Sequence, residues 1–100
     1  MTTQLSFPHP GVLLRQEFLD PLKITPYRLA RAIGVPPTRI AEILAGRRSV
    51  TAETGLLLDR YFGLSEGYWL GLQHDYDLRK ARQSLGAKLG AVKPLAAVAA

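Results

Sequence analysis

Proline and glycine recur along this chain at positions that divide it into separate helical segments. Proline suits the first turn of a helix, where its missing N–H costs no hydrogen bond, and glycine is favoured just after the last turn. Between them, apolar residues recur at spacings of three and four, with no alternating run typical of a strand. We therefore predict an all-α fold. The five predicted segments run from Pro10 to Leu19, from Thr25 to Gly34, from Pro36 to Gly46, from Thr51 to Gly63 and from Ser65 to Gly86.

The boundaries of these helices have local causes. Pro21 is expected to end the first helix, because proline cannot continue a regular α-helix. Hydroxyl side chains that precede an apolar run favour the N-cap position, so Thr25, Thr51 and Ser65 are expected to cap the second, fourth and fifth helices.

The predicted core consists of the apolar side chains that share one face of each helix. They are Leu14 and Phe18; Leu29, Ala30 and Ile33; Ile40, Ile43 and Leu44; Leu57, Leu58, Tyr61 and Phe62; and Trp69, Leu72 and Tyr76. A chain of 100 residues that is 47% apolar has room for one such core and little for a second. We expect one domain over residues 1–85 and a flexible tail over the alanine-rich segment 86–100, which has no aromatic residue.

The composition also indicates the cellular compartment in which the protein is expected. Without cysteine the chain can form neither a disulfide nor a thiolate zinc site. No run approaches the roughly 18 apolar residues that span a bilayer, and the first residues lack the pattern of a signal peptide. We expect a cytoplasmic protein with no membrane partner.

Positive charge is concentrated in one part of the chain. The formal net charge is +5, and the segment from Lys23 to Arg48, with six bases and the single acid Glu42, carries all of it. One basic face is therefore predicted. Such a face suits a polyanion such as nucleic acid and equally a solvated surface without a partner, so charge alone does not decide between them.

Two short helices joined by a tight turn lie inside this basic segment. A helix-turn-helix needs a small residue where the helices cross, a glycine in the turn and apolar residues on the inner face of the second helix. Ala30, Gly34, Ile40 and Ile43 fill these positions. We predict the motif over about residues 25–45. The arrangement resembles the lambda-repressor-like fold, a five-helix bundle in which the motif forms the second and third helices.

The outward face of the second motif helix carries the candidate base contacts, Pro37, Thr38, Arg39 and Glu42. Side chains near such a helix N-terminus approach base edges in the major groove. Two hydrogen bonds from Arg39 to a guanine would give about 1–3 kcal/mol of discrimination. A phosphate contact or an ion pair with Glu42 is the alternative for Arg39. Glu42 is expected to orient a neighbouring arginine rather than to accept from a cytosine.

Three further residues are candidates for contacts with phosphates. Thr25 begins the first motif helix, and its hydroxyl can bind phosphate while it caps the helix. Arg47 and Arg48 follow the second motif helix and can reach the DNA backbone, although two solvated arginines are the alternative.

The stripe formed by Trp69, Leu72 and Tyr76 has two interpretations. At helical spacing these residues are most simply part of the core. They are also our candidate dimer interface, because one short recognition helix covers too few base pairs on its own. A symmetric dimer would read an inverted repeat with its two recognition helices about 34 Å apart.

Residues 9 to 78 resemble the HigA antitoxins, also called VapI-like, of the Xre/Cro-type helix-turn-helix family. The shared motifs include the opening His9-Pro10-Gly11, the stretch GVPPTRIAEI from residue 34, Gly46-Arg47-Arg48, Arg60-Tyr61-Phe62-Gly63 and Trp69-Leu70. The resemblance implies an antitoxin in the bacterial cytoplasm and nucleoid, which binds an operator at its own promoter and neutralises a HigB-like toxin, a ribosome-dependent ribonuclease. Val12 stands where relatives commonly have an acid.

Two other functions would fit part of these features. A stand-alone or phage-type repressor would share the DNA contacts but lack a toxin, and a protein-interaction module would use the basic face for an acidic partner. An enzyme is not expected, because His9 and His74 lie far apart and no phosphate-binding loop or HExxH motif is present. We accordingly expect no cofactor and no metal.

Overall fold

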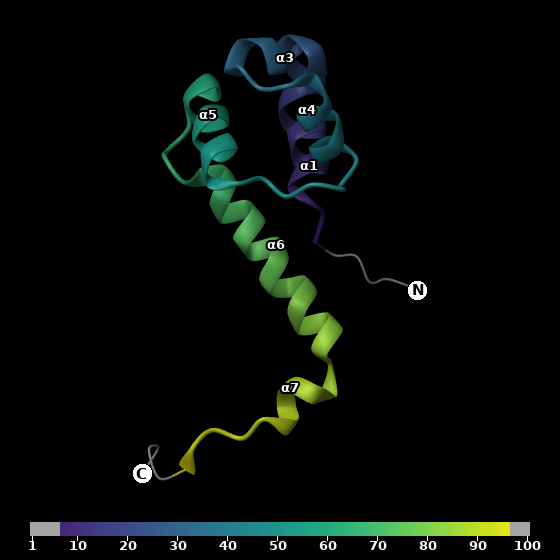
Figure 1. Cartoon of the computed structure of the whole chain (residues 1–100), viewed down its shortest axis with the longest axis vertical. Helices are drawn as coiled ribbons and strands as arrows, with labels where there is room; N and C mark the ends of the chain where they lie inside the picture. The colour runs from purple at the N-terminus through teal and green to yellow at the C-terminus, as the bar shows by residue number, and fades with distance from the viewer. Residues whose placement is uncertain (1–6, 97–100) are drawn as a thin grey trace.

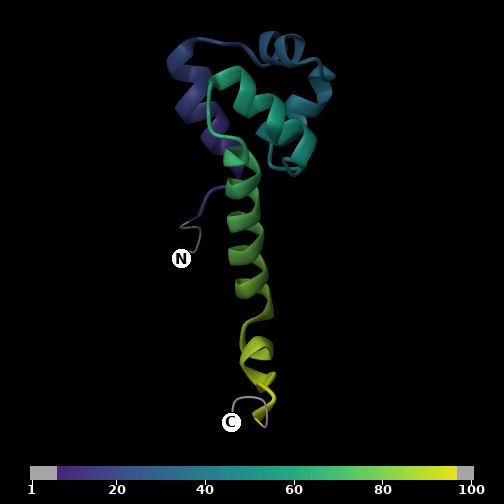
Figure 2. The same cartoon turned by 90° about the vertical axis from the view of Figure 1, so that its left-hand side faces the viewer.

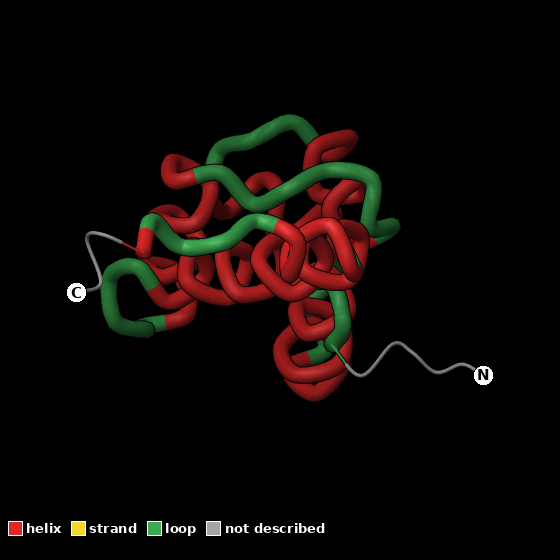
Figure 3. Tube along the Cα trace, turned by 90° about the horizontal axis from the view of Figure 1, so that it is seen from below, coloured by secondary structure: helices red, strands yellow, loops and turns green. Residues whose placement is uncertain are grey.

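The computed structural model describes residues 7–96, and within that range every regular element is helical (Figure 1 and Figure 3). The all-α prediction is confirmed. In chain order the elements are α1 (Pro10–Leu13), the π-helical η1 (Leu14–Leu19), α2 (Asp20–Leu22), α3 (Pro26–Ile33), α4 (Pro37–Leu44), α5 (Ala52–Phe62), α6 (Tyr68–Leu85) and α7 (Ala87–Ala91). None of the helices in the described range is long and apolar enough to span a membrane.

The first helix is longer than predicted, because Pro21 does not end it. α1, η1 and α2 follow one another without a break, and the chain leaves the helical conformation only at Lys23, whose φ of 56° is left-handed. In a regular α-helix the proline ring would collide with the carbonyl four residues earlier. Here the preceding turn is π-helical, with the N–H of Asp20 donating to the carbonyl of Arg15. This wider turn accommodates the ring.

α3 and α4 form the predicted helix-turn-helix. The side-chain oxygen of Thr25 accepts a hydrogen bond of 3.1 Å from the N–H of Arg28 and caps α3, as predicted. α3 ends at Gly34, whose φ of 76° is left-handed and favours glycine. The residues predicted to pack between the two helices are all fully buried: Ala30, Ile40 and Ile43.

α5 begins after Thr51 and ends before Gly63, as predicted, but it buries a different face. Leu57 and Tyr61, expected in the core, are 40% and 36% exposed. The buried face contains Leu58, the residues three or four positions from it, namely Thr54, Gly55 and the half-buried Phe62, and the adjacent Asp59. Leu57 is rotated by about 100° from Leu58, on the side away from this face.

α6 begins at Tyr68, and its cap is not Ser65 as predicted but a residue of α5. The buried carboxylate of Asp59 accepts hydrogen bonds from the N–H groups of Gly67, at 2.8 Å, and Trp69, at 3.1 Å. A carboxylate at this end satisfies N–H groups that have no partner within the helix and interacts favourably with the helix dipole. α5 therefore fixes the direction in which α6 starts.

Trp69 lies at the centre of the core with its side chain fully buried. Its ring packs against Phe18 with centroids 5.3 Å apart, and Phe18 in turn contacts Phe62 at 4.7 Å. The other buried apolar residues are Leu14, Leu19, Leu29, Ala30, Ile33, Val35, Ile40, Ile43, Val50 and Leu58. The core is thus built from the helices up to α5 and the first turns of α6.

The C-terminal half of α6 projects away from this core as a single helix (Figure 1 and Figure 2). α6 continues to Leu85, the full length that the sequence allowed, and every residue from Asp77 to Ala96 is exposed. The radius of gyration is accordingly 17.0 Å, against about 13 Å for a compact chain of this length. Part of the expected tail, Ala87–Ala91, forms the short helix α7. The flexibility of segment 86–100 stays a prediction, and residues 97–100 lie outside the described range.

Candidate nucleic-acid interface

α4 is positioned by direct contact between its backbone and α1. Gly11 lies so close to α4 that a Cβ built on it would overlap the carbonyl oxygen of Ile43. Only glycine permits such an approach. Because Ile40 and Ile43 are turned into the core, the opposite face of α4 is turned toward solvent. α1 therefore contacts the inner side of α4 and leaves its outer face uncovered.

This outer face carries the residues predicted to contact bases. Pro37 and Thr38 are exposed in the first turn, and Arg39 and Glu42 are half-buried. None of the four belongs to the core. No side chain caps α4, so its N-terminus can offer an N–H group to an acceptor such as a phosphate oxygen. The N-terminal turn of α4 is thus open to a ligand.

Glu42 is paired with Arg48 and not with Arg39. Its Oε1 atom accepts a hydrogen bond of 2.7 Å from Nε of Arg48. The left-handed residue Gly46, at a φ of 77°, turns the chain so that Arg48 returns beside α4. Both side chains are more than a third exposed, so this pair contributes little to stability. Within residues 7–96, Arg39 forms no ion pair.

Arg39 lines a hollow between α4 and the start of α5. The hollow has a volume of about 340 Å³ and is lined by Arg39, Arg48, Ser49, Thr51, Ala52, Glu53 and Thr54. Thr51 caps α5 by accepting a hydrogen bond of 3.3 Å from the N–H of Thr54. Arg39 and the positive end of the α5 dipole therefore face this space together with the carboxylate of Glu53, while Arg48 is held by Glu42.

Thr25 and Arg47, at the two ends of the motif, are both exposed. The capping bond uses the Thr25 oxygen as an acceptor, so its hydroxyl hydrogen is still able to donate. Arg47 donates its backbone N–H to the carbonyl of Glu42 at 2.9 Å, while its guanidinium has no carboxylate partner among the described residues.

The residues predicted for a dimer interface do not share an exposed surface. Trp69 is fully buried in the core of its own chain and cannot contact a second chain, so the core interpretation is confirmed for it and the interface prediction is wrong. Leu72 and Tyr76 are half-buried. Tyr76 packs edge-on against His9 with ring centroids 5.1 Å apart. The exposed large apolar residues of α6 are instead Tyr68, Leu70, Leu78 and Leu85.

Gln73, which was not predicted from the sequence, is buried behind the loop that carries Arg47 and Arg48. Its Oε1 atom accepts a hydrogen bond of 2.8 Å from the N–H of Val50, and its Nε2 donates to Oδ1 of Asp77 at 2.9 Å. Gln73 lies four residues after Trp69, so helical periodicity alone would have placed it on the buried face. Its polar side chain concealed that placement.

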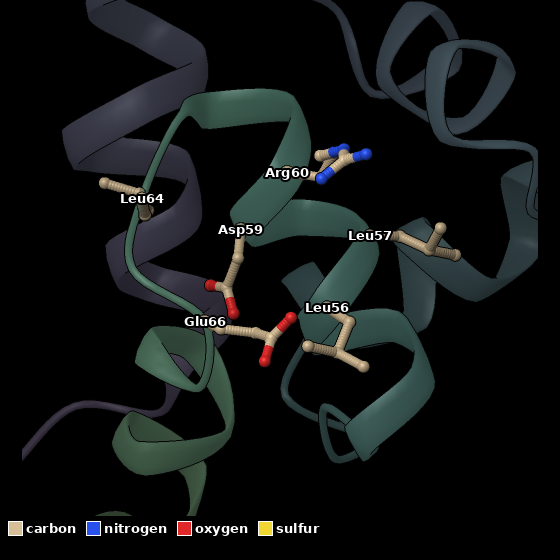
Figure 4. A pocket seen from close by; sticks show the side chains of 6 residues that line it. All are labelled: Leu56, Leu57, Asp59, Arg60, Leu64 and Glu66. Atoms are coloured by element: carbon tan, nitrogen blue, oxygen red, sulfur yellow. The ribbon is translucent and has the colours of Figure 1, made fainter.

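Another hollow lies between α5 and the loop that leads to α6 (Figure 4). It measures about 370 Å³ and is lined by Leu56, Leu57, Asp59, Arg60, Leu64 and Glu66. None of the predicted DNA contacts lines it. Within residues 7–96, no group of three or more histidines and carboxylates is arranged to hold a metal ion. The candidate interface is therefore α4 with the adjoining ends of α3 and α5.

These features define a small helix-turn-helix protein whose second motif helix presents a free outer face among basic residues. The helix-turn-helix family matches residues 14–69. The chain belongs to this family, and within it to the Xre-type proteins of the HigA, or VapI-like, group, as its sequence motifs indicated.

Three relatives illustrate the similarity. Virulence-associated protein I of Dichelobacter nodosus is 47% identical over 75 residues, which are 75% of this chain and 69% of that protein. Antitoxin HigA-1 of Vibrio cholerae is 34% identical over 85% of this chain and 80% of that protein. The solved structure of Pseudomonas aeruginosa antitoxin HigA with the higBA promoter has a TM-score of 0.83 and 36% identity, and the match covers 88% of this chain and 97% of that one.

Proposed function

We propose that this chain is a sequence-specific DNA-binding protein that represses its own promoter. The observation that carries the proposal is the free N-terminal turn of α4, with Thr38 exposed and Arg39 half-buried inside the basic segment. The major groove admits an α-helix, and residues at its N-terminal end contact the bases. The similar HigA whose structure was solved with a promoter supports the same role here.

The candidate residues divide between contacts with bases and contacts with phosphates. The contacts with DNA are made by Thr25, Pro37, Thr38, Arg39, Glu42, Arg47 and Arg48. Arg39 donates two hydrogen bonds to a guanine, and Thr25 and Arg47 bind phosphates. Glu42 holds Arg48 in place through their 2.7 Å ion pair, so that Arg48 meets the backbone with its orientation already set.

The proposed operator is an inverted repeat read by a homodimer. A single eight-residue helix covers too few base pairs for a specific site. The interface lies in the C-terminal third of the chain and includes Leu72 and Tyr76 but not Trp69. The exposed side chains Leu78 and Leu85 extend the apolar surface available to a second copy.

The proposed second partner is a HigB-like toxin, a ribosome-dependent ribonuclease that the chain would bind and neutralise. Membership of the HigA group and the antitoxin names of two relatives support this proposal. The chain itself would act without catalysis or cofactor in the bacterial cytoplasm, at the nucleoid.

A salt titration tests the DNA contact. The affinity for a duplex that spans the chain's own promoter should fall linearly on a log-log plot, with a slope of about 0.9 for each phosphate neutralised. A flat response would exclude the proposed interface.

Co-expression tests the toxin partner. The product of the adjacent small reading frame should arrest growth alone, and co-expression with this chain should restore growth and yield a co-purifying complex. If DNA binding is found but no neighbouring toxin exists, the stand-alone or phage-type repressor is the correct function.

A further inference from the structure

We propose that Lys80 of α6 and Arg47 of the loop between α4 and α5 bind one backbone phosphate of the operator together, outside the helix-turn-helix. The inference rests on the proposed DNA-binding function and adds α6 to the surface that contacts DNA. In the sequence, Lys80 lies far outside the basic segment, among bases and acids that balance one another.

The site is a small polar hollow between the loop and α6. It has a volume of about 170 Å³, and most of its lining is polar. Arg47, Arg48 and Ser49 line it from the loop, and Tyr76 and Lys80 line it from α6. Cations and hydroxyl donors from two separate elements therefore meet around one space, which has the composition of a phosphate site.

The contacts around the hollow leave Arg47 and Lys80 as the available cations. Arg48 is engaged by Glu42 at 2.7 Å. Asp77, the one acid of the lining, accepts a hydrogen bond of 2.9 Å from Gln73, which partly satisfies its charge. Neither Arg47 nor Lys80 forms an ion pair in the part of the chain that the structure describes.

The remaining basic side chain of the lining, His9, does not supply the charge. Burial lowers the pKa of His9, and nearby Lys80 lowers it further against the opposing effect of Asp77. Its Nδ1 atom accepts a hydrogen bond of 2.8 Å from the N–H of Gly11, which requires that nitrogen to be unprotonated. The attraction for a phosphate therefore comes from Arg47 and Lys80.

One interaction fixes the loop relative to α6, and another orients the Lys80 side chain. The hydrogen bond from Val50 to Gln73 ties the loop to α6. The ammonium of Lys80 lies 5.8 Å from the centroid of the Tyr76 ring, which directs this flexible side chain along α6 toward the loop. Because Lys80 lies beside Arg47 in this hollow, a phosphate that reaches Arg47 also meets the ammonium of Lys80.

Lys80→Gln tests this site, with Lys88→Gln as its matched control. Both lysines are exposed and both variants remove one positive charge, but Lys88 lies on α7 and does not line the hollow. Binding is measured against salt on a duplex spanning the chain's own promoter and on an unrelated duplex of equal length. Circular dichroism and the thermal midpoint verify that both variants fold.

For Lys80→Gln we expect the salt slope to fall by about 0.9 for each protomer bound. At about 0.1 M salt, the affinity for both duplexes should fall on the order of eightfold per protomer, because a phosphate contact carries no sequence preference. Lys88→Gln should leave the slope unchanged, and Lys80→Arg should restore it.

Equal slopes for Lys80→Gln and Lys88→Gln would overturn the inference, since the lysine would then act only through the overall charge. This outcome differs from failure of the proposed function. If the proposed function were wrong, the wild-type chain itself would show no salt-dependent binding to either duplex.

Discussion

The side-chain oxygen Oε1 of Gln73 accepts a hydrogen bond of 2.8 Å from the backbone N–H of Val50, 23 residues earlier in the chain. Both residues are buried. The bond therefore replaces water as the partner of that N–H group and joins the loop that carries Arg47 and Arg48 to α6.

Replacing Gln73 by leucine should destabilise the domain. The N–H of Val50 would remain buried without an acceptor, at a cost of about 1–3 kcal/mol in the free energy of unfolding. Urea denaturation measures the change. Gln83→Leu on the exposed surface of α6 is the control, and it should change stability by less than about 0.5 kcal/mol. Equal effects of the two variants would show that the bond has no structural importance.

Gly11→Ala should displace α4 as well as destabilise the domain. The added Cβ would overlap the carbonyl of Ile43, and backbone atoms can yield only by moving the two helices apart. We expect a loss of about 1–3 kcal/mol and weaker binding to DNA, measured by urea denaturation and on the promoter duplex.

Gly71→Ala is the matched control for Gly11→Ala. Gly71 is also helical, but no atom outside its own helix lies within 4 Å of a Cβ built there. Alanine should stabilise α6 at this position by about 0.4–1 kcal/mol. If both substitutions changed stability in the same direction, the close contact between α1 and α4 would not be present in solution.

Arg39→Ala and Arg47→Ala should have different effects on DNA binding. Removing Arg39 should cost about 1–3 kcal/mol of binding free energy on the operator and relax the preference at one base pair. Removing Arg47 should lower the affinity for the operator and for an unrelated duplex equally, and it should lower the salt slope by about 1. Fluorescence anisotropy on duplexes with single base-pair changes separates these effects. Arg39 would be a phosphate contact if its removal lowered all affinities equally.

Lowering the pH should weaken the fold through His9. Burial lowers the pKa of His9 in the folded state, so the unfolded chain binds more protons between that lowered pKa and the ordinary histidine pKa of 6.5. The stabilisation is therefore fully present above pH 6.5 and is lost as the pH falls through the folded-state pKa. His9→Asn retains a side-chain acceptor for Gly11 and should remove this part of the pH dependence.

Urea denaturation at about pH 7.5 and about pH 5.5 measures the effect of His9. An identical pH dependence for the wild-type chain and His9→Asn would show that protonation of His9 is not coupled to folding.

The parts of the fold that could be predicted are those with local causes. The threonine cap at Thr25 and the left-handed glycine at Gly34 act within a single turn, so the bounds of α3 follow from adjacent residues. The start of α6 could not be found in this way, because its cap is the carboxylate of Asp59 in another helix. The run Leu56 to Leu58 offers three apolar phases, and tertiary packing selects only Leu58 for the core.

The candidate interface follows the same division. The outward face of α4 was predictable from the inward spacing of Ile40 and Ile43. The partner of Glu42 was not, because Arg39 is the nearer arginine on the helix, whereas a turn after α4 brings Arg48 into contact. Lys80 was equally hidden, since only the folded chain places it beside Arg47.

The projecting half of α6 is not covered by the core of its own chain. From Asp77 onward, each α6 residue lies exposed, and short solitary helices are only marginally populated in water. In the proposed dimer, part of the free energy that orders these turns would come from contact with the second protomer. Amide hydrogen exchange over this stretch would then slow with rising protein concentration.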